Sequence, residues 1–120
     1  MSEDGVEKKY VKEAFDTNWV VPLGPNVNGF EADLEAFVGS DKKVVALSAG
    51  TAAVHLALLA CDVGPGDEVL VQSFTFCASS HPITYLGAKP VFIDSERDTW
   101  NMDPELLERA IVERKEKTGK

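Results

Sequence analysis

The sequence predicts an α/β fold with a mostly parallel central sheet and flanking helices. Short apolar segments alternate with segments that carry apolar residues at helical spacing, in the order strand, helix, strand, helix, strand, helix. The predicted strands are rich in Val, Leu and Ile without polar alternation, which indicates burial on both faces. Helices between such strands supply the crossovers that a parallel sheet needs. We expect strands at residues 43–47, 68–72 and 90–94.

The N-terminal part precedes this alternation. Residues 5–16 place apolar side chains at helical spacing and predict a surface helix. The following residues are rich in Pro and Gly and predict an extended connector, after which Asn28 is expected to cap a helix that Gly39 ends. We therefore expect a helical arm and connector over residues 1–39 and an α/β part over residues 40–120.

Turn and cap residues set the bounds of the later elements. Helices are expected at about 51–61, 79–86 and 104–117. Gly87 suits a helix C-terminus, and Asp103 followed by Pro104 is typical of an N-cap and a first-turn proline. Three strands are few for an open α/β sheet and leave an unpaired edge, so more chain or a partner is expected.

Composition narrows the class of protein. A chain of 120 residues with 44% hydrophobic and 27% charged residues is an ordinary globular composition. A net charge of −8 with scattered Lys and Arg argues against nucleic acid and anionic membranes as partners. The apolar runs are too short to span a membrane, and the first residues lack a secretory signal, so we expect a cytoplasmic protein.

Gly50, Thr51 and Ala52 follow the first predicted strand and begin a helix. Gly50 allows close approach of a ligand, Thr51 offers a hydroxyl, and the N–H groups of Thr51, Ala52 and Ala53 are expected to be free at the positive end of the helix dipole. This pattern is typical of a phosphate-binding turn. The alternative interpretation is that Ser48 or Thr51 caps the helix and Gly50 only turns the chain.

Phe76 follows the second predicted strand directly. The carboxyl ends of parallel strands meet at one edge, where ligands of open α/β sheets bind, so its ring is expected near the phosphate-binding turn. A phosphate site beside a flat ring suits a planar phosphorylated cofactor. Pyridoxal phosphate, a flavin and a nucleotide all fit that description, and an ordinary core phenylalanine is the alternative.

Other polar residues are weaker candidates. His55 and His81 lack an obvious carboxylate partner and are interpreted as a half-buried and a helix-end histidine. The acidic segment 94–105 lacks the glycine and terminal glutamate of a calcium loop, so we interpret it as a solvated connection. Cys61 and Cys77 have no metal-ligand spacing and are expected to be reduced. We nominate no metal ligand and no catalytic residue.

The order of "NVNGFEADLEAFVG", "VVALSAGTAAVHLALLACDVGPGDEVLV" and "SFTFCASSHPITYLGAKPVFIDSERDTWNMDPELLERAI" resembles the N-terminal part of the DegT/StrS family. These are pyridoxal phosphate-dependent nucleotide-sugar aminotransferases with the aspartate aminotransferase fold. The resemblance implies that this chain is the first, incomplete part of the cofactor-binding large domain. It implies that Gly50, Thr51 and Ala52 hold the cofactor phosphate, that Phe76 stacks on the pyridine ring, and that Leu23 and Gly24 contact the sugar nucleotide.

The resemblance also implies that two functional residues of the family lie downstream of this segment. Family members bind the cofactor covalently through a lysine well downstream, and an acidic residue on a later strand keeps the ring nitrogen of the cofactor protonated. None of the lysines in these 120 residues stands in that motif. The implied complete enzyme is a homodimer that transfers an amino group, often from glutamate, to a keto sugar. Two alternatives stay open: a sugar dehydratase of the same family, and a non-catalytic α/β binding module.

Overall fold

The computed structural model describes residues 3–39 and 41–119. The chain divides into two compact units, Met1–Ala46 and Leu47–Lys120, and each is described by itself. We predicted a boundary between residues 39 and 40; the residues after it stay with the first unit because helix side chains bind them. The assignment of the two parts to an arm and a cofactor-binding domain stays a prediction.

The first unit holds two helices, α1 (Val6–Asp16) and α2 (Pro25–Val38). The prediction that Asn28 caps the second helix is wrong, because the N-cap of α2 is Gly24, four residues earlier, and Pro25 lies in the first turn. Proline suits that position, since its missing N–H would have no helical partner there. Gly39 ends the helix as predicted, and its N–H donates to the carbonyl of Glu35 at 3.0 Å.

The strand predicted at residues 43–47 is absent from the described structure of this chain. The N–H of Val44 donates to the carboxylate of Glu35 at 3.2 Å, and the N–H of Ala46 donates to the carboxylate of Glu31 at 2.8 Å. Glu31 and Glu35 lie one turn apart on α2. The segment therefore binds helix side chains, and a strand needs a neighbouring strand that the described residues do not provide.

Glu35 is the more strongly engaged of these two carboxylates. The hydrogen bond from the N–H of Val44, and a second from the ammonium of Lys43 at 3.2 Å, lower the pKa of Glu35 below its ordinary value. Both contacts favour the ionised carboxylate. Glu35 is therefore charged while it holds residues 43 and 44 against α2.

The second unit is built on a two-stranded parallel sheet of β1 (Glu68–Gln72) and β2 (Lys89–Ile93). Their register pairs Glu68 with Lys89 and runs to Gln72 with Ile93. The predicted bounds of β1 are confirmed, and β2 begins one residue earlier than predicted. The crossover contains a short 3₁₀-helix, η1 (Cys77–Ser79), and α4 (His81–Tyr85), with Pro82 in the first turn as expected.

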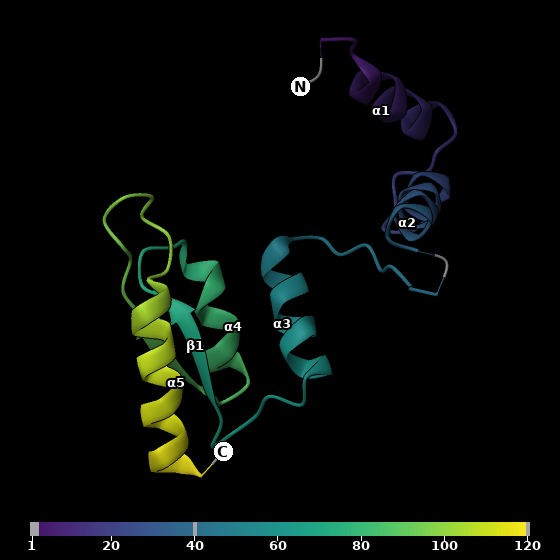
Figure 1. Ribbon diagram of the computed structural model, residues 1–120. Coiled ribbons are helices and arrows are strands. Elements are labelled where there is room, and N and C mark those ends of the chain that lie inside the picture. Colours follow the sequence, from purple (N-terminus) through teal and green to yellow (C-terminus); the bar gives the residue numbers. More distant parts are fainter. Residues whose placement is uncertain (1–2, 40, 120) are drawn as a thin grey trace. The chain divides into compact units, whose positions relative to one another are not determined.

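Helices cover both faces of this sheet. Val71 packs with Ile83 of α4 and with Ala88, and Leu58 of α3 (Gly50–Ala60) adds to this core. The opposite face receives α5 (Pro104–Thr118), whose Arg114 reaches Glu68. Figure 1 shows α4 and α5 on either side of β1. The predicted α/β class is confirmed.

The strands are less buried than predicted. Only Val71 of β1 and Ile93 of β2 are buried, whereas Phe92 is 56% exposed. Full burial of a parallel strand needs neighbours on both edges as well as helices on both faces. In the described residues β1 and β2 have only each other as neighbours. The apolar composition of the strands therefore exceeds what this part of the fold buries.

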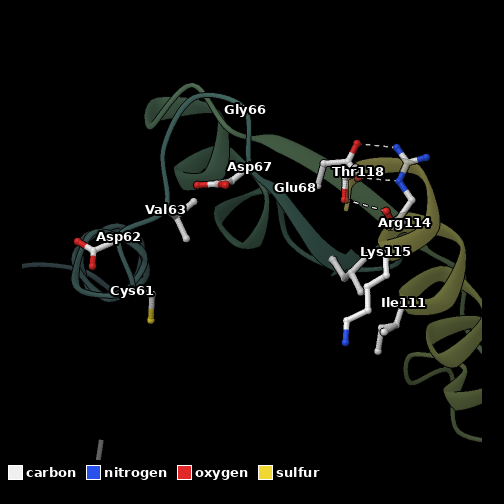
Figure 2. Close-up of a pocket in the computed structure, with 11 residues that line it drawn as sticks. Cys61, Asp62, Val63, Gly66, Asp67, Glu68, Ile111, Arg114, Lys115 and Thr118 are labelled. Carbon is white, nitrogen blue, oxygen red and sulfur yellow. Dashed lines mark hydrogen bonds and ion pairs between the residues drawn. The ribbon is translucent and has the colours of Figure 1, made fainter. Parts of the chain in front are cut away.

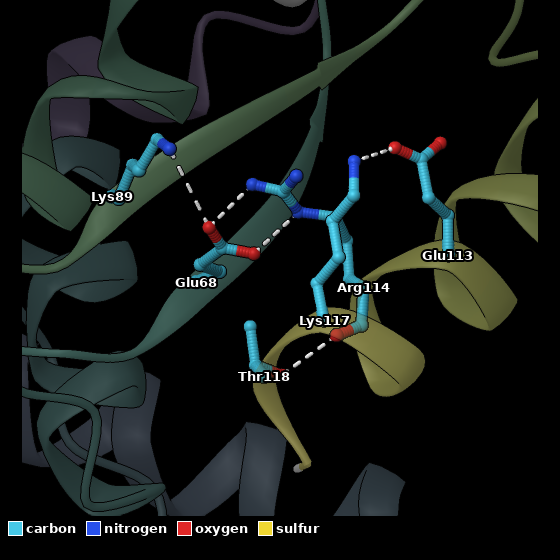
Figure 3. A network of polar contacts seen from close by, with 6 residues as sticks. All are labelled: Glu68, Lys89, Glu113, Arg114, Lys117 and Thr118. Carbon is cyan, nitrogen blue, oxygen red and sulfur yellow. Dashed lines mark hydrogen bonds and ion pairs between the residues drawn. The ribbon is translucent and has the colours of Figure 1, made fainter.

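Glu68 joins the start of β1 to the last turns of α5. Its two carboxylate oxygens accept from Nε and Nη2 of Arg114, each at 2.6 Å, and Lys89 lies 3.5 Å away (Figure 3). This bidentate pair lowers the pKa of Glu68 and raises that of Arg114. A separate exposed pair on α5 joins Glu113 and Lys117.

The ends of the later helices match the sequence signals. The side chain of Asp103 accepts from the N–H groups of Glu105 at 2.8 Å and Leu106 at 3.1 Å. Gly87 takes the left-handed conformation after α4, with φ of 72°. The predicted N-cap at Asp103 and helix end at Gly87 are confirmed. None of the described helices is both long and apolar enough to cross a membrane.

Replacing Asp103 tests the cap. We expect Asp103→Ala to lower the free energy of unfolding by about 1 kcal/mol, because two N–H groups of α5 lose their acceptor. Asp103→Asn keeps an acceptor oxygen and is expected to lose much less. Urea denaturation of both variants measures this difference, and equal stabilities of the Ala and Asn variants would contradict the cap.

Replacing Glu68 tests the strand-to-helix ion pair through its pH dependence. Because the folded state lowers the pKa of Glu68, the pair stabilises the fold above the ordinary carboxylate pKa of about 4.3 and loses this effect as the pH falls through the lowered value. We expect Glu68→Gln to lower the urea midpoint at pH 7. In acid, the urea midpoint of the variant should approach that of wild type. Glu113→Gln, which breaks an exposed pair, is the control and should change little at either pH.

Candidate functional site

The start of α3 carries free hydrogen-bond donors. Its N-cap is Ala49 in an extended conformation, and the first helical bond runs from the N–H of Ala53 to the carbonyl of Ala49 at 3.2 Å. None of the hydrogen bonds found among residues 3–39 and 41–119 uses the N–H groups of Gly50, Thr51 or Ala52. The expectation that the N–H group of Ala53 is free is therefore wrong. The three free N–H groups are those of Gly50, Thr51 and Ala52, one residue earlier than predicted.

The capping interpretation of this turn is not supported. An alanine occupies the N-cap position, and no side chain caps the helix. Within the described parts of the chain, no hydrogen bond involves the hydroxyl of Ser48 or Thr51. Three N–H groups and the Thr51 hydroxyl thus remain available to an acceptor, beside the positive end of the helix dipole.

Gly50 leaves space that the chain itself does not use. Its φ is not in the left-handed region, so the backbone does not require glycine for a turn. Apart from its two chain neighbours and the backbone of its own helix, a Cβ built on Gly50 would meet no described atom within 4 Å. Neither conformation nor packing within this structure demands glycine here. A residue without a side chain at the first position of the helix lets a ligand approach the backbone donors closely.

Phe76 presents a free aromatic ring at the end of the loop that leaves β1. It is the N-cap of η1, its side chain is 78% exposed, and none of the ring contacts found in the described residues involves it. The alternative of a core phenylalanine is therefore wrong for this chain. α3 packs against η1, and Figure 1 shows β1 pointing toward the end of the unit at which α3 begins.

The structure thus brings the free donors of α3 and the loop with Phe76 to one end of the second unit. Leu23 and Gly24 belong to the first unit. Leu23 is 72% exposed, and Gly24 has φ of 146° with the ring of Trp19 beside it. Their contact with a substrate stays a prediction.

The two histidines have a packing role. The ring of His55 on α3 meets Tyr85 of α4 edge-on, with centroids 5.6 Å apart, and His81 lies 6.5 Å from the same ring. His55 is half-buried and His81 begins α4, as we expected. This aromatic contact fixes α3 against α4 and so holds the open helix start in place.

The acidic connection after β2 is an ordered loop. Ser95 and Met102 form an isolated antiparallel bridge, and the carboxylate of Glu96 accepts from the N–H and hydroxyl of Thr99. These bonds, the hydroxyl first, lower the pKa of Glu96. Within the described residues, no group of three or more His, Cys, Asp or Glu is placed to hold a metal ion.

The sequence did not predict a hollow beside this loop, which is lined by residues of both sheet-end loops, among them Phe74, Glu96 and Trp100. The rings of Phe74 and Trp100 lie 5.7 Å apart, and Trp100 has a positive φ of 63°, rare for a bulky residue. The amide of Gln72 donates to the carbonyl of Trp100 at 2.7 Å and holds it there. An unusual backbone angle has no signal in a single sequence, since tertiary contacts impose it.

A second hollow lies where β1 begins, away from the predicted site (Figure 2). Arg114 and Glu68 line it, and both are committed to each other. Cys61, free and exposed, lies at its other side, and Cys77 is also free. That both cysteines are reduced in the protein stays a prediction. We interpret this hollow as a gap left where α5 packs on the sheet, and not as a binding site.

Fold and site define a class: an α/β protein in which a helix without a side-chain cap begins near the carboxyl end of a parallel sheet. Within that class, the DegT/DnrJ/EryC1/StrS aminotransferase family matches residues 1–118. The chain belongs to this family. The family resemblance inferred from its motifs is confirmed.

Individual relatives support the assignment. The chain is 56% identical over 111 residues to EpsN of Bacillus subtilis, which is named as a pyridoxal phosphate-dependent aminotransferase, and 43% identical over 111 residues to GDP-perosamine synthase of Caulobacter vibrioides. Each alignment covers 92% of this chain, but 28% and 30% of the respective relative. The chain thus spans less than a third of the length of these relatives.

Solved structures agree with the fold. The sugar aminotransferase Spr1654 of Streptococcus pneumoniae, in its PMP form, superimposes with a TM-score of 0.74 at 40% identity, over 83% of this chain and 26% of that one. NtdA of Bacillus subtilis with bound PMP gives a TM-score of 0.77 at 30% identity, over 92% and 25%. The fold is therefore the N-terminal part of the fold of PLP-dependent aminotransferases.

Proposed function

We propose that the complete protein is a pyridoxal phosphate-dependent aminotransferase that acts on a keto group of a nucleotide-linked sugar. Glutamate is the proposed amino donor, and amino-sugar or cell-surface polysaccharide biosynthesis is the proposed role. GDP-perosamine synthase and an aminotransferase of a UDP-linked oxo sugar of Pseudomonas aeruginosa, 45% identical over 92 residues, support the substrate class. We further propose a cytoplasmic homodimer.

The open start of α3 is the observation that carries the proposal. Gly50, Thr51 and Ala52 offer three N–H groups for which no described residue supplies an acceptor, and Thr51 adds a hydroxyl. Gly50 adds no side chain beside these donors. These donors fit the phosphate of pyridoxal phosphate, whose dianion gains from charge-assisted hydrogen bonds and from the helix dipole. We propose that they anchor the cofactor.

Phe76 is the proposed platform for the pyridine ring. Its face is exposed, and its loop packs at the end of the unit where α3 begins. Stacking of a flat ring on an aromatic face contributes about 0.5–1.5 kcal/mol beyond burial of area. When bound, pyridoxal phosphate supplies an electron sink for amino transfer. The role of residues 50–52 and 76 is to bind and orient it.

Thr51→Ala tests the phosphate site. In the complete protein we expect it to weaken pyridoxal phosphate binding by roughly 1.5–3 kcal/mol, because a hydroxyl donor to a charged acceptor is lost. Thr51→Ser keeps the hydroxyl and is the matched control. Titration of the cofactor's visible absorbance gives the dissociation constants, and inorganic phosphate should compete less well with cofactor in the Ala variant. Equal affinity of the Ala variant and wild type would contradict the phosphate site.

Gly50→Ala separates ligand space from protein stability. Apart from its chain neighbours and its own helix backbone, the new methyl group would meet no described atom within 4 Å, and alanine favours a helix over glycine by up to about 1 kcal/mol. We therefore expect the cofactor-free protein to be as stable as wild type or more stable, while cofactor binding weakens because the methyl group occupies the phosphate space. Thermal denaturation without cofactor and the absorbance titration measure the two effects. Loss of stability with unchanged affinity would show that Gly50 serves the fold instead.

A further inference from the structure

Phe76 combines an exposed ring with a closely held backbone. The hydroxyl oxygens of Thr75 and Ser79 lie 3.0 Å apart and form a hydrogen bond that spans the residues between them. The N–H of Ser79 donates to the carbonyl of Phe76, also at 3.0 Å. Two hydrogen bonds thus restrain the backbone of Phe76 and form a small ring of bonds around it. Its side chain makes none of the aromatic contacts found among the described residues.

This ring of bonds is tied to the rest of the unit at both ends. Before it, the N–H of Ser73 extends the sheet by donating to the carbonyl of Ile93 at 2.8 Å, and the N–H of Thr75 donates to the carbonyl of Ser73 at 3.2 Å. After it, η1 packs against α3 and α4. The loop is therefore anchored to the sheet on one side and to the helix of the phosphate site on the other.

An exposed aromatic side chain gains little from its own contacts, so it needs its backbone fixed if it is to meet a ligand in one orientation. If the loop became ordered only when the ligand binds, the lost conformational entropy would weaken binding. Hydrogen bonds that order the loop beforehand remove that cost. Neither hydroxyl is needed for η1 itself, whose backbone bonds are made without them.

We propose that Thr75 and Ser79 are positioning residues, whose hydroxyl pair holds Phe76 in the orientation that stacks on the cofactor ring. The stacking of Phe76 on the cofactor rests on the proposed function. The restraint of the loop by the Thr75–Ser79 hydrogen bond, called the clamp below, does not. Thr75 and Ser79 act through Phe76 and touch no reacting atom. The pair makes the two residues a unit, so removing either hydroxyl has the same consequence as removing both.

The test uses the complete protein with Thr75→Val, Ser79→Ala and the double variant. Each single change is expected to weaken pyridoxal phosphate binding about two- to ten-fold, the range for one hydrogen bond, and the double variant no more than either single one. The visible circular dichroism per bound cofactor should fall as well, since it reports how the cofactor ring is held. Unchanged affinity and dichroism, or losses that add up in the double variant, would overturn the proposal.

Two matched controls exclude a general effect of losing a hydroxyl. Thr75→Ser keeps the bond to Ser79 and should behave as wild type. Ser80→Ala removes a neighbouring hydroxyl, which donates to the carbonyl of Cys77 at 3.3 Å and does not reach Thr75. It should leave cofactor affinity unchanged. A loss in Ser80→Ala equal to that in Ser79→Ala would overturn the specific pair.

Amide hydrogen exchange in the cofactor-free protein separates the clamp from the proposed function. The N–H of Ser79, which donates to the carbonyl of Phe76, should exchange faster in Thr75→Val and Ser79→Ala than in wild type and Thr75→Ser. Equal exchange rates in all four proteins would overturn the clamp. If exchange accelerates but wild type binds no pyridoxal phosphate, the clamp stands, and the proposed function and stacking role are overturned.

Discussion

The parallel pairing of β1 with β2 is the constraint on which the second unit depends. Parallel strands cannot be joined by a tight turn, so the chain must return along one face, and η1 and α4 make that crossover. The same pairing sends both strands toward one end of the unit. The loop with Phe76 and the acidic loop leave from that end, which is also where α3 begins.

Two small features distinguish the start of α3 from an ordinary helix N-terminus. An ordinary N-terminus uses a Ser, Thr, Asp or Asn side chain to satisfy one of its free N–H groups, as Asp103 does for α5. At α3 that position is Ala49, and Gly50 adds no side chain in front of the donors. The same chain therefore contains a helix start that a side chain caps and one whose N–H groups are left for the proposed ligand.

Sequence signals within one segment, such as a helix cap or an apolar run, predicted more of this fold than signals whose outcome depends on contact with another segment. Asp103 with Pro104 and the five residues of β1 were predicted at their observed positions, because cap chemistry and a dense apolar run are properties of the segment itself. Asn28 was misjudged because two capping signals stand close together and Pro25 takes the earlier position. Which N–H groups are free at α3 depended on a one-residue shift in the helix start, which composition does not determine.

The strand expected at residues 43–47 failed for a different reason, and its contacts carry a consequence for how a sheet can grow. Successive N–H groups of an extended chain point to opposite sides. Those of Val44 and Ala46 are taken by the carboxylates of Glu35 and Glu31. While these two bonds are in place, neither N–H group can donate to a neighbouring strand. Pairing through Val44 and Ala46 would therefore require α2 to release both groups, so the two carboxylates compete with a sheet for this segment.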